Sequence, residues 1–212
     1  MRQPFLLFTF AATLSMAVTV AARQPNVIVI LTDDHGFADL SCQEVVDDIR
    51  TPYIDTLAFN GVRMTSGYVT APQCVPSRAG LLSGRYQNRF GVESNGEPLV
   101  GFNHQDTLAE RLQQAGYATG MIGKWHLGPS SEIVTHGFDD VFYQGGSWTN
   151  YDIRGNDTPP GTAFKGLYHL DAKSAAAKAF IQRHHDVPFF LYLAYRAPHV
   201  PLDATQKYLD RF

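Results

Sequence analysis

Three short apolar runs, each followed at once by polar residues, constrain the fold of this chain more than any other feature. They occupy residues 26–31, 117–122 and 189–194, and the first, Asn-Val-Ile-Val-Ile-Leu, is rich in β-branched side chains. Such runs predict strands that are buried on both faces, as in a parallel sheet. Because helical patterns lie between the runs, we expect an α/β fold with a mostly parallel central sheet flanked by helices.

One predicted helix precedes a further predicted strand in the first half of the chain. Residues 51–61 carry a threonine cap, a proline at the first helical position and a glycine at the end. Ile54, Leu57 and Ala58 are expected on the inward face of this helix. Residues 62–69 predict a second strand, and the chain that follows it leads to Cys74.

Two more helices are predicted, one just before the second apolar run and one between the second and the third. Residues 107–110, Thr-Leu-Ala-Glu, form a capping box that begins one helix. Residues 171–185 predict an alanine-rich helix. Its expected inward side chains are Ala175, Ala176, Ala179 and Phe180.

Composition limits the classes of partner. The chain has 212 residues, which suits one domain, and 44% hydrophobic and 12% aromatic residues, which suit a protein with a core. The formal net charge of -3 at pH 7 gives no reason to expect nucleic acid or an anionic membrane as partner. An anionic substrate would therefore have to be held by a local group of basic residues.

Residues 1–22 are predicted to be a signal peptide. Arg2 supplies positive charge, residues 5–20 are apolar, and small residues follow at a plausible cleavage point. The apolar run is short for a membrane span, and no second run of spanning length follows, so we expect no stable membrane insertion. An uncleaved membrane anchor is the alternative; we expect an exported protein.

Polar side chains that can carry chemistry follow each apolar run. Asp33 and Asp34 follow the first run, Lys124 and His126 follow the second, and His199 follows the third. The carboxyl ends of parallel strands meet at one edge of an open α/β sheet, where ligands bind. The sequence therefore predicts one site at that edge.

The adjacent carboxylates Asp33 and Asp34 suggest a metal. They repel each other unless a cation lies between them, and their oxygen ligands suit calcium or magnesium. The same pair is also found in helix caps and solvated turns, so the two residues alone leave both interpretations open.

Lys124 and His126 alternate, so on an extended segment both side chains point to the same side. Together they could bind an anion or donate a proton to a leaving group. An ordinary exposed pair is the alternative interpretation. Trp125, between them, is expected to point into the core.

Cys74 lies on a proline-bounded turn, with Arg78 four residues later and a predicted helix start at 77–82. Free backbone N–H groups and the positive dipole end of a helix suit an anionic group at Cys74. A buried, inert thiol before an ordinary core helix is the alternative.

The amino-acid sequence around Cys74 points to one family. Cys74-x-Pro76-Ser77-Arg78, followed by Ala-Gly-Leu-Leu-Ser-Gly-Arg at 79–85, closely resembles the signature of the sulfatase family. The resemblance implies that a formylglycine-generating enzyme oxidises Cys74 to formylglycine, an aldehyde whose hydrate is the nucleophile. A disulfide to Cys42 could not then form.

The resemblance also implies a metal site. In sulfatases an Asp-Asp pair after the first strand ligates the metal beside the formylglycine. Asp33 and Asp34 take that position here, so the implied ligands are Asp33, Asp34 and residue 74. The implied ion is Ca²⁺, with Mg²⁺ as the other candidate.

Two further segments resemble sulfatase motifs. Gly-Lys-Trp-His-Leu-Gly at 123–128 is similar to the motif that supplies a substrate-binding lysine and histidine, here Lys124 and His126. Ala-Pro-His-Val-Pro around His199 resembles the segment that carries a second active-site histidine. The family often has Asn where this chain has Arg196, which could add positive charge near the substrate.

What the resemblance implies is a sulfuric ester hydrolase acting on sulfated sugars or aryl sulfates. The hydrate at Cys74 would attack sulfur, with Arg78 and Lys124 stabilising the developing charge. His199 or Lys124 would assist the leaving oxygen. His126 would help to deprotonate the second hydroxyl of the hydrate, so that sulfate leaves and the aldehyde returns.

The resemblance implies that residues 23–212 correspond to only the N-terminal portion of a sulfatase catalytic domain. Family members run to several hundred residues, and their later part supplies an Asp-Asn metal pair and another lysine. We therefore expect a C-terminally incomplete fold with an unpaired sheet edge and weak or no activity for this chain alone. The implied location is the periplasm or the exterior, or a lysosome-like compartment in a eukaryote.

Three alternatives to a working sulfatase stay open. A phosphoester or phosphonate-ester hydrolase of the same superfamily would normally have Ser or Thr in place of Cys74. A non-enzymatic binding fragment would keep an unmodified thiol and lack calcium affinity. A thiol enzyme would be inactivated by alkylation of Cys74.

Substrate choice is expected to lie in loops at the carboxyl edge of the sheet. Residues 143–166 are rich in Gly, Thr, Asn and Pro and predict such a loop. The side chains in it that could touch a sugar or aryl group are Ser147, Trp148, Asn150 and Tyr151.

Overall fold

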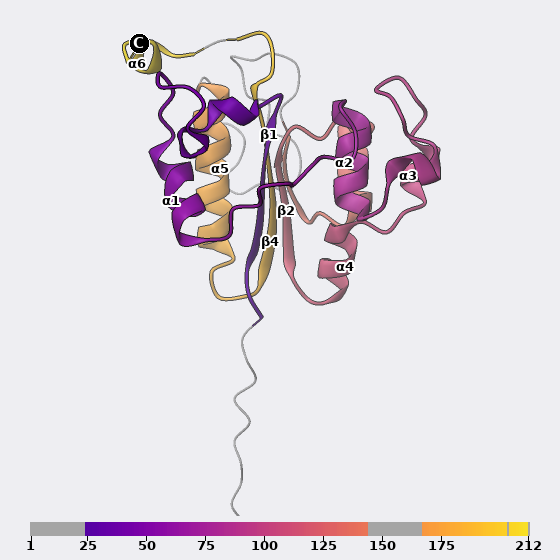
Figure 1. The fold of residues 1–212 in the computed structure, drawn as a ribbon. Helices are drawn as coiled ribbons and strands as arrows, with labels where there is room; N and C mark the ends of the chain where they lie inside the picture. The colour runs from indigo at the N-terminus through magenta and orange to yellow at the C-terminus, as the bar shows by residue number, and fades with distance from the viewer. Residues whose placement is uncertain (1–23, 144–166, 203, 212) are drawn as a thin grey trace, which may run out of the picture.

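The computed structural model describes residues 24–143, 167–202 and 204–211. Its centre is a four-stranded sheet in the order β1-β4-β2-β3, in which every neighbouring pair is parallel (Figure 1). The strands are β1 (Val27–Asp33), β2 (Ala118–Gly123), β3 (Asp140–Tyr143) and β4 (Phe189–Pro198). The prediction of an α/β fold with a parallel sheet is confirmed.

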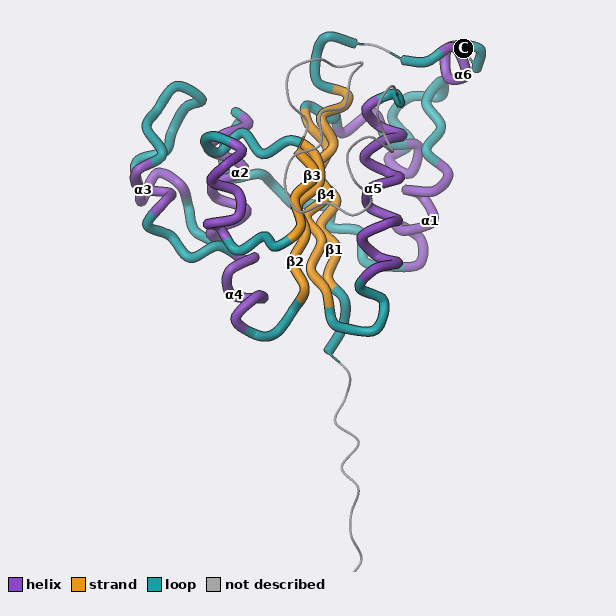
Figure 2. The backbone as a smooth tube through the Cα atoms, turned by 180° about the vertical axis from the view of Figure 1, so that it is seen from behind, coloured by secondary structure: helices purple, strands orange, loops and turns teal. Residues whose placement is uncertain are grey.

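Helices lie on both sides of the sheet (Figures 1 and 2). On one side α5 (His169–Arg183) lies against the sheet with α1 (Pro52–Asn60) beyond it. On the other side lie α2 (Cys74–Ser83), α3 (Val100–Asn103) and α4 (Leu108–Gln114). The remaining short helices are α6 (Gln206–Leu209) and the 3₁₀ turns Phe37–Asp39, Ser41–Gln43, Gln87–Phe90 and Ser130–His136.

β4 is the strand that joins the two halves of the core. Successive side chains of a strand point to opposite faces. Accordingly, Phe190 and Tyr192 belong to the apolar cluster on the α2 side, whereas Leu191 and Leu193 belong to the cluster on the α5 side. All four side chains are buried, which explains why the run reads as continuously apolar rather than alternating.

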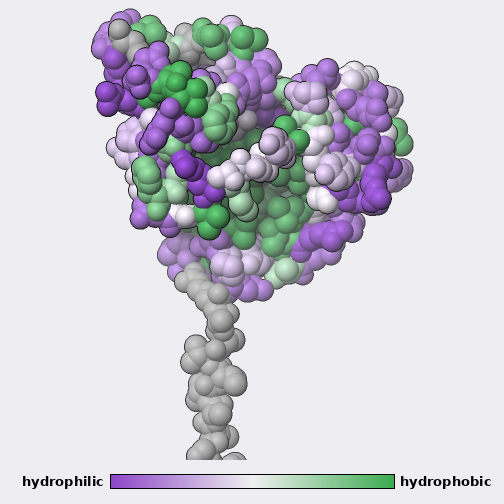
Figure 3. Space-filling view, in the orientation of Figure 1, coloured by the Kyte–Doolittle hydropathy of each residue, from purple (hydrophilic) through white to green (hydrophobic). Residues whose placement is uncertain are grey.

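β1 is one of the two edge strands of the sheet, and the prediction that it is buried on both faces is wrong. In the described part of the chain no strand pairs with its outer side. Ile28 and Ile30 of β1 are 44% and 55% exposed. β1 lies at the front of Figure 1, and Figure 3 shows the same face. Apolar residues gather in its hollowed middle.

The helix predicted from residue 52 is confirmed, but the prediction that Ile54 and Leu57 face inward is wrong. Ile54 is 40% and Leu57 is 65% exposed, because α5 rather than α1 covers that side of the sheet. The strand predicted at 62–69 is also wrong. These residues form turns and irregular chain, and all of them are exposed, so no neighbouring strand or buried face stabilises an extended segment.

The capping box at Thr107 is confirmed. The Thr107 hydroxyl accepts a hydrogen bond from the Glu110 backbone N–H at 3.1 Å, and the Glu110 carboxylate accepts one from the Thr107 N–H at 2.7 Å. These contacts satisfy donors that α4 would otherwise leave unpaired. In α5, Ala176 and Phe180 are buried as predicted, but Ala175 and Ala179 are only partly so.

The predicted third strand extends further than expected. β4 runs to Pro198, so the residues predicted to form a polar turn continue the strand, and His199 follows it directly. The predicted signal peptide, residues 1–22, lies outside the described residues. Within them, no helix is both long and apolar enough to cross a membrane.

Candidate active site

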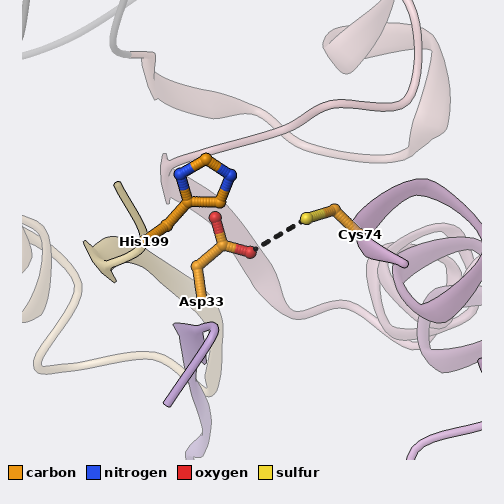
Figure 4. A group of neighbouring side chains, drawn as sticks. All are labelled: Asp33, Cys74 and His199. Atoms are coloured by element: carbon orange, nitrogen blue, oxygen red, sulfur yellow. Dashed lines mark hydrogen bonds between the residues drawn. The ribbon is translucent and has the colours of Figure 1, made fainter. Parts of the chain in front are cut away.

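The carboxyl edge of the sheet brings together most of the predicted site residues. Asp33 is the last residue of β1, Cys74 is the first residue of α2, and Lys124 and His199 directly follow β2 and β4. In Figure 4 Asp33 lies between Cys74 and His199, with the thiol pointing toward its carboxylate. The predicted meeting of strand ends at one edge is confirmed.

Asp33 is the centre of a buried ion-pair network. Its side chain is 5% exposed and receives the Arg78 guanidinium at 3.2 Å and the Lys124 ammonium at 2.5 Å. Burial raises the pKa of Asp33, but the hydrogen bond from Lys124 and the charge of Arg78 outweigh it, so the pKa lies below its usual range. The carboxylate is therefore charged at neutral pH.

Arg78 is held rigidly from three directions. Its guanidinium donates to the Lys124 carbonyl oxygen at 2.9 Å, to the Tyr192 hydroxyl at 3.0 Å and to Asp33. The side chain is 2% exposed. A planar guanidinium fixed in this way keeps its orientation without further ordering when an anion arrives.

Cys74 faces both the carboxylate and the ammonium. The thiol donates to the Asp33 carboxylate at 3.3 Å, and Lys124 donates to Sγ at 3.3 Å. Burial raises the pKa of the Cys74 thiol, Lys124 opposes this, and the negative charge of Asp33 raises the pKa further. The net effect is a thiol that stays protonated at neutral pH, which is unfavourable for a thiolate nucleophile.

The start of α2 is fixed by two amide side chains. The Val75 backbone N–H donates to the Asn95 side-chain oxygen at 3.0 Å, and the Asn95 N–H donates to the Gln73 side-chain oxygen at 2.8 Å. These bonds satisfy one free donor of the helix start. They also tie the turn before Cys74 to the loop at Asn95, so the position of the reactive atom is well defined.

The metal-binding prediction involves Asp33, Asp34 and Cys74. One ligand atom each of Asp33, Cys74 and His199 lies within 4.8 Å of the others. Asp34 is not one of these three residues: its side chain is 56% exposed, and its carboxylate lies 3.7 Å from His199 Nε2. A carboxylate beside residue 74 suits a hard cation, although both Asp33 oxygens contact cationic side chains here. The ligand set therefore stays a prediction.

His126 differs from its predicted geometry. Its φ of 61° is left-handed, so the segment is not extended at this residue and the alternation argument does not apply. Desolvation of the ring and the positive charges of Lys124 and Arg78 lower the pKa of His126. A neutral imidazole near the network can accept a proton. Trp125 is fully buried, as predicted.

A cavity of about 200 Å³ opens beside Cys74. Its walls come from the end of β1, the turn before α2 and the first turns of that helix. The lining residues are Leu31, Thr32, Asp33, Asp34, His35, Val69, Ala71, Pro72, Gln73, Cys74, Ser77 and Arg78. The cavity is large enough for a tetrahedral oxyanion group, and Arg78 at its wall supplies positive charge.

Sequence reasoning missed two residues. Tyr192 orients Arg78 from within a run that reads as plain core. Lys173 is fully buried in α5, and its Nζ lies 3.3 Å from His169 Nδ1. The sequence does indicate this burial, because positions 169, 173, 176 and 180 share one helical face. Arg196 lies in β4 and lowers the pKa of His126. The four predicted substrate-contacting residues at 147–151 lie outside the described residues.

Known proteins are similar to this chain in sequence and in fold. A family model described as Sulfatase matches residues 25–212. Arylsulfatase J of Mus musculus is 32% identical over 218 residues, which cover 92% of this chain and 36% of that protein. N-acetylgalactosamine-6-O-sulfatase of Bacteroides thetaiotaomicron is 31% identical over 254 residues, which cover 85% of this chain and 49% of that protein.

Two solved structures are similar over most of this chain. The crystal structure of Ps i-CgsB matches with a TM-score of 0.75 and 31% identity, over 90% of this chain and 49% of that one. A structure solved in complex with its substrate D-glucosamine-2-N,6-O-disulfate matches with a TM-score of 0.69 and 29% identity. The match covers 84% of this chain and 35% of that one. This chain thus spans half or less of the length of these relatives. With the family model matched over residues 25–212, the chain belongs to the sulfatase family.

Proposed function

We propose that the protein containing this chain hydrolyses sulfate esters of aryl alcohols or sugars, with residue 74 converted to formylglycine. The observation that carries the proposal is the position of Cys74 at the start of α2, in contact with Lys124 and Asp33 and backed by the fixed guanidinium of Arg78. A site with two cationic groups beside one reactive atom suits an anionic ester.

The residues around Cys74 divide into binding and proton-transfer groups. Lys124 and Arg78 bind and orient the sulfate oxygens and stabilise charge on them. His199 donates a proton to the leaving alcohol, and Lys124 is the second candidate for that role. His126, whose pKa is lowered, accepts a proton when sulfate is released.

Two groups complete this chemistry when present. Formylglycine supplies a hydrated aldehyde as nucleophile, and a divalent cation neutralises negative charge beside it. Asp33 is the described residue that would hold the cation, with His199 and Asp34 on the same edge. Calcium is the proposed ion because carboxylate oxygens are its preferred ligands.

The alternatives are less well supported by the site. The raised pKa of Cys74 disfavours a thiol enzyme, since the thiolate is the reactive form. A phosphoester hydrolase normally uses Ser or Thr at this position, and the chain has Cys. The names of the relatives extend to arylsulfatase and N-acetylgalactosamine-6-O-sulfatase, so both substrate classes belong to the proposal. Export remains a prediction from residues 1–22.

The deciding measurement is the mass of the tryptic peptide 64–78 from chain produced together with a formylglycine-generating enzyme. We expect the mass of the aldehyde in place of the Cys74 thiol. An unmodified thiol, with the modifying enzyme active on a control peptide, would contradict the proposal and favour a binding fragment.

Turnover provides the second test. We expect any hydrolysis of 4-nitrophenyl sulfate by the modified chain to exceed that of 4-nitrophenyl phosphate. Hydrolysis of 4-nitrophenyl sulfate should be lost in Cys74→Ala and retained in Cys42→Ala, the matched control at the other free cysteine. A preference for phosphate would identify the phosphoester hydrolase instead.

A further inference from the structure

Tyr192 lies within the core of the sheet, yet its hydroxyl reaches the site residue Arg78. Its strand, β4, is held on both sides, because Tyr192 is aligned with Val29 of β1 and with Met121 of β2. The ring is fully buried and stacks on Phe138 with centroids 6.3 Å apart. Close packing of this kind gives the hydroxyl a fixed position in the fold.

The Tyr192 hydroxyl accepts one of three hydrogen bonds from the guanidinium of Arg78. Nη1 donates to this hydroxyl at 3.0 Å and to the Lys124 carbonyl oxygen at 2.9 Å, and Nη2 donates to the Asp33 carboxylate at 3.2 Å. The three acceptors belong to β4, to the residue after β2 and to β1. Both N–H groups of Nη1 are thus used, and the plane of the guanidinium is defined.

Tyr192 holds Arg78 without cancelling its charge. Burial raises the pKa of Tyr192 and outweighs the opposing effect of the Arg78 charge, so the phenol is neutral at neutral pH. The carbonyl group of Lys124 is neutral as well. Among the described residues, Asp33 is the carboxylate that pairs with Arg78, and it is shared with the Lys124 ammonium. Within this group two positive charges face one negative charge, which favours an incoming anion.

We infer that Tyr192 is a positioning residue for sulfate binding: its neutral hydroxyl fixes the guanidinium of Arg78 at the cavity beside Cys74 without neutralising it. Arg78 lines this cavity and Tyr192 does not, so Tyr192 acts through Arg78. A donor that is fixed before its ligand arrives loses less entropy on binding. The inference rests on the proposed function and names a further residue on which its sulfate affinity depends.

Tyr192→Phe removes the acceptor and keeps the ring that fills the core. One N–H of Arg78 Nη1 then lies buried without its partner, which is unfavourable, so the guanidinium is expected to turn toward other acceptors. The probe is inorganic sulfate, titrated into the unmodified chain and followed by the backbone amide signal of Cys74 in NMR spectra. Sodium chloride at equal ionic strength is the reference. We expect saturable binding that is weakened about fivefold in Tyr192→Phe.

Tyr195 provides a matched control in the same strand. Its hydroxyl also makes a hydrogen bond, with the Ser174 hydroxyl of α5 at 2.8 Å, on the side of the sheet opposite Arg78. Tyr195→Phe should lower the unfolding free energy, as Tyr192→Phe does, and leave sulfate affinity unchanged. A purely structural role of Tyr192 predicts instead that both folded variants bind sulfate as the unaltered chain does.

A spectroscopic measurement tests the inference without any variant. The acceptors on Nη1 and Nη2 block rotation of these groups about their bonds to Cζ, so Arg78 should give separate NMR signals for its two Nη groups. Arg111, whose side chain is 65% exposed, is the reference and should give one averaged signal.

Three results would overturn the inference. They are no saturable sulfate binding by the unaltered chain, equal sulfate affinity of Tyr192→Phe and Tyr195→Phe, and an averaged Nη signal for Arg78. Because Cys74 is unmodified in these measurements, none of them depends on formylglycine. The mass of peptide 64–78 tests the proposed function separately, so either the inference or the proposed function can fail alone.

Discussion

Replacing Lys173 with methionine should make this chain more stable, and by an amount that depends on pH. Lys173 is fully buried in α5, and burial, reinforced by the positive charges of Arg196 and Arg78, lowers its pKa from 10.5 to about 7. A shift of this size corresponds to about 5 kcal/mol of unfavourable free energy for the charged form in the folded state. Methionine fills a similar volume without a charge.

The sign of the pH dependence follows from proton binding. Between pH 7 and 10.5 the unfolded chain holds a proton on Lys173 that the folded chain lacks, so the stability of the unaltered protein rises with pH. Below pH 7 the full penalty of about 5 kcal/mol applies, and at pH 9 about 2 kcal/mol remains. Loss of the contact between Lys173 and His169 offsets about 1 kcal/mol of the gain.

Urea unfolding at pH 6 and pH 9 measures this difference. Lys173→Met should gain about 4 kcal/mol at pH 6 and about 1 kcal/mol at pH 9. Lys178→Met, at an exposed lysine of the same helix, is the control and should change stability little at either pH. An equal gain at both pH values, or a loss at pH 6, would refute the reasoning that burial of the ammonium determines the effect.

Three further changes test other parts of the fold. Thr107→Ala removes the cap of α4 and should lower the unfolding free energy by about 1 kcal/mol in urea titration. Asp33→Asn leaves Arg78 buried without its counter-charge and should cost about 3–5 kcal/mol in the same titration at pH 7. The Asp33 pKa lies below its usual range, so this difference should shrink as the pH falls through that lowered value, and a constant difference would contradict the ion-pair argument. Gly120→Ala places a methyl group 2.5 Å from an aromatic ring of α5 and should lower the thermal midpoint, whereas Gly96→Ala, with no atom within 4 Å, should not.

The sequence predicts the sheet well because the signals for it are local. The apolar runs that became β2 and β4 are buried from both sides, so their composition alone indicates their position. The run that became β1 is apolar as well, although Ile28 and Ile30 on one of its faces are 44% and 55% exposed. The run at 62–69 has strand-like residues but no neighbouring strand, and pairing is not a local property. For the same reason the exposed face of α1 could not be foreseen.

The site was only partly predictable. Asp33, Cys74 and Lys124 follow from strand ends and one helix start, which the fold brings to one edge. The left-handed backbone of His126 depends on how β2 leaves the sheet, which alternation does not reveal. Lys173 was missed because a lysine on an alanine-rich helix suggests solvent, and the burial comes from the sheet beneath.

The pairing of β1 with β4 also determines the order in which the fold can form. Asn26 and Phe189, which are hydrogen-bonded across this pair, are separated by 163 positions. At ordinary rates of synthesis the first strand therefore waits about ten to thirty seconds for its partner. β2 and β3, close in sequence, can pair much earlier. The nascent chain therefore exposes the apolar strand β1 until β4 has been made, and an unpaired apolar strand favours aggregation.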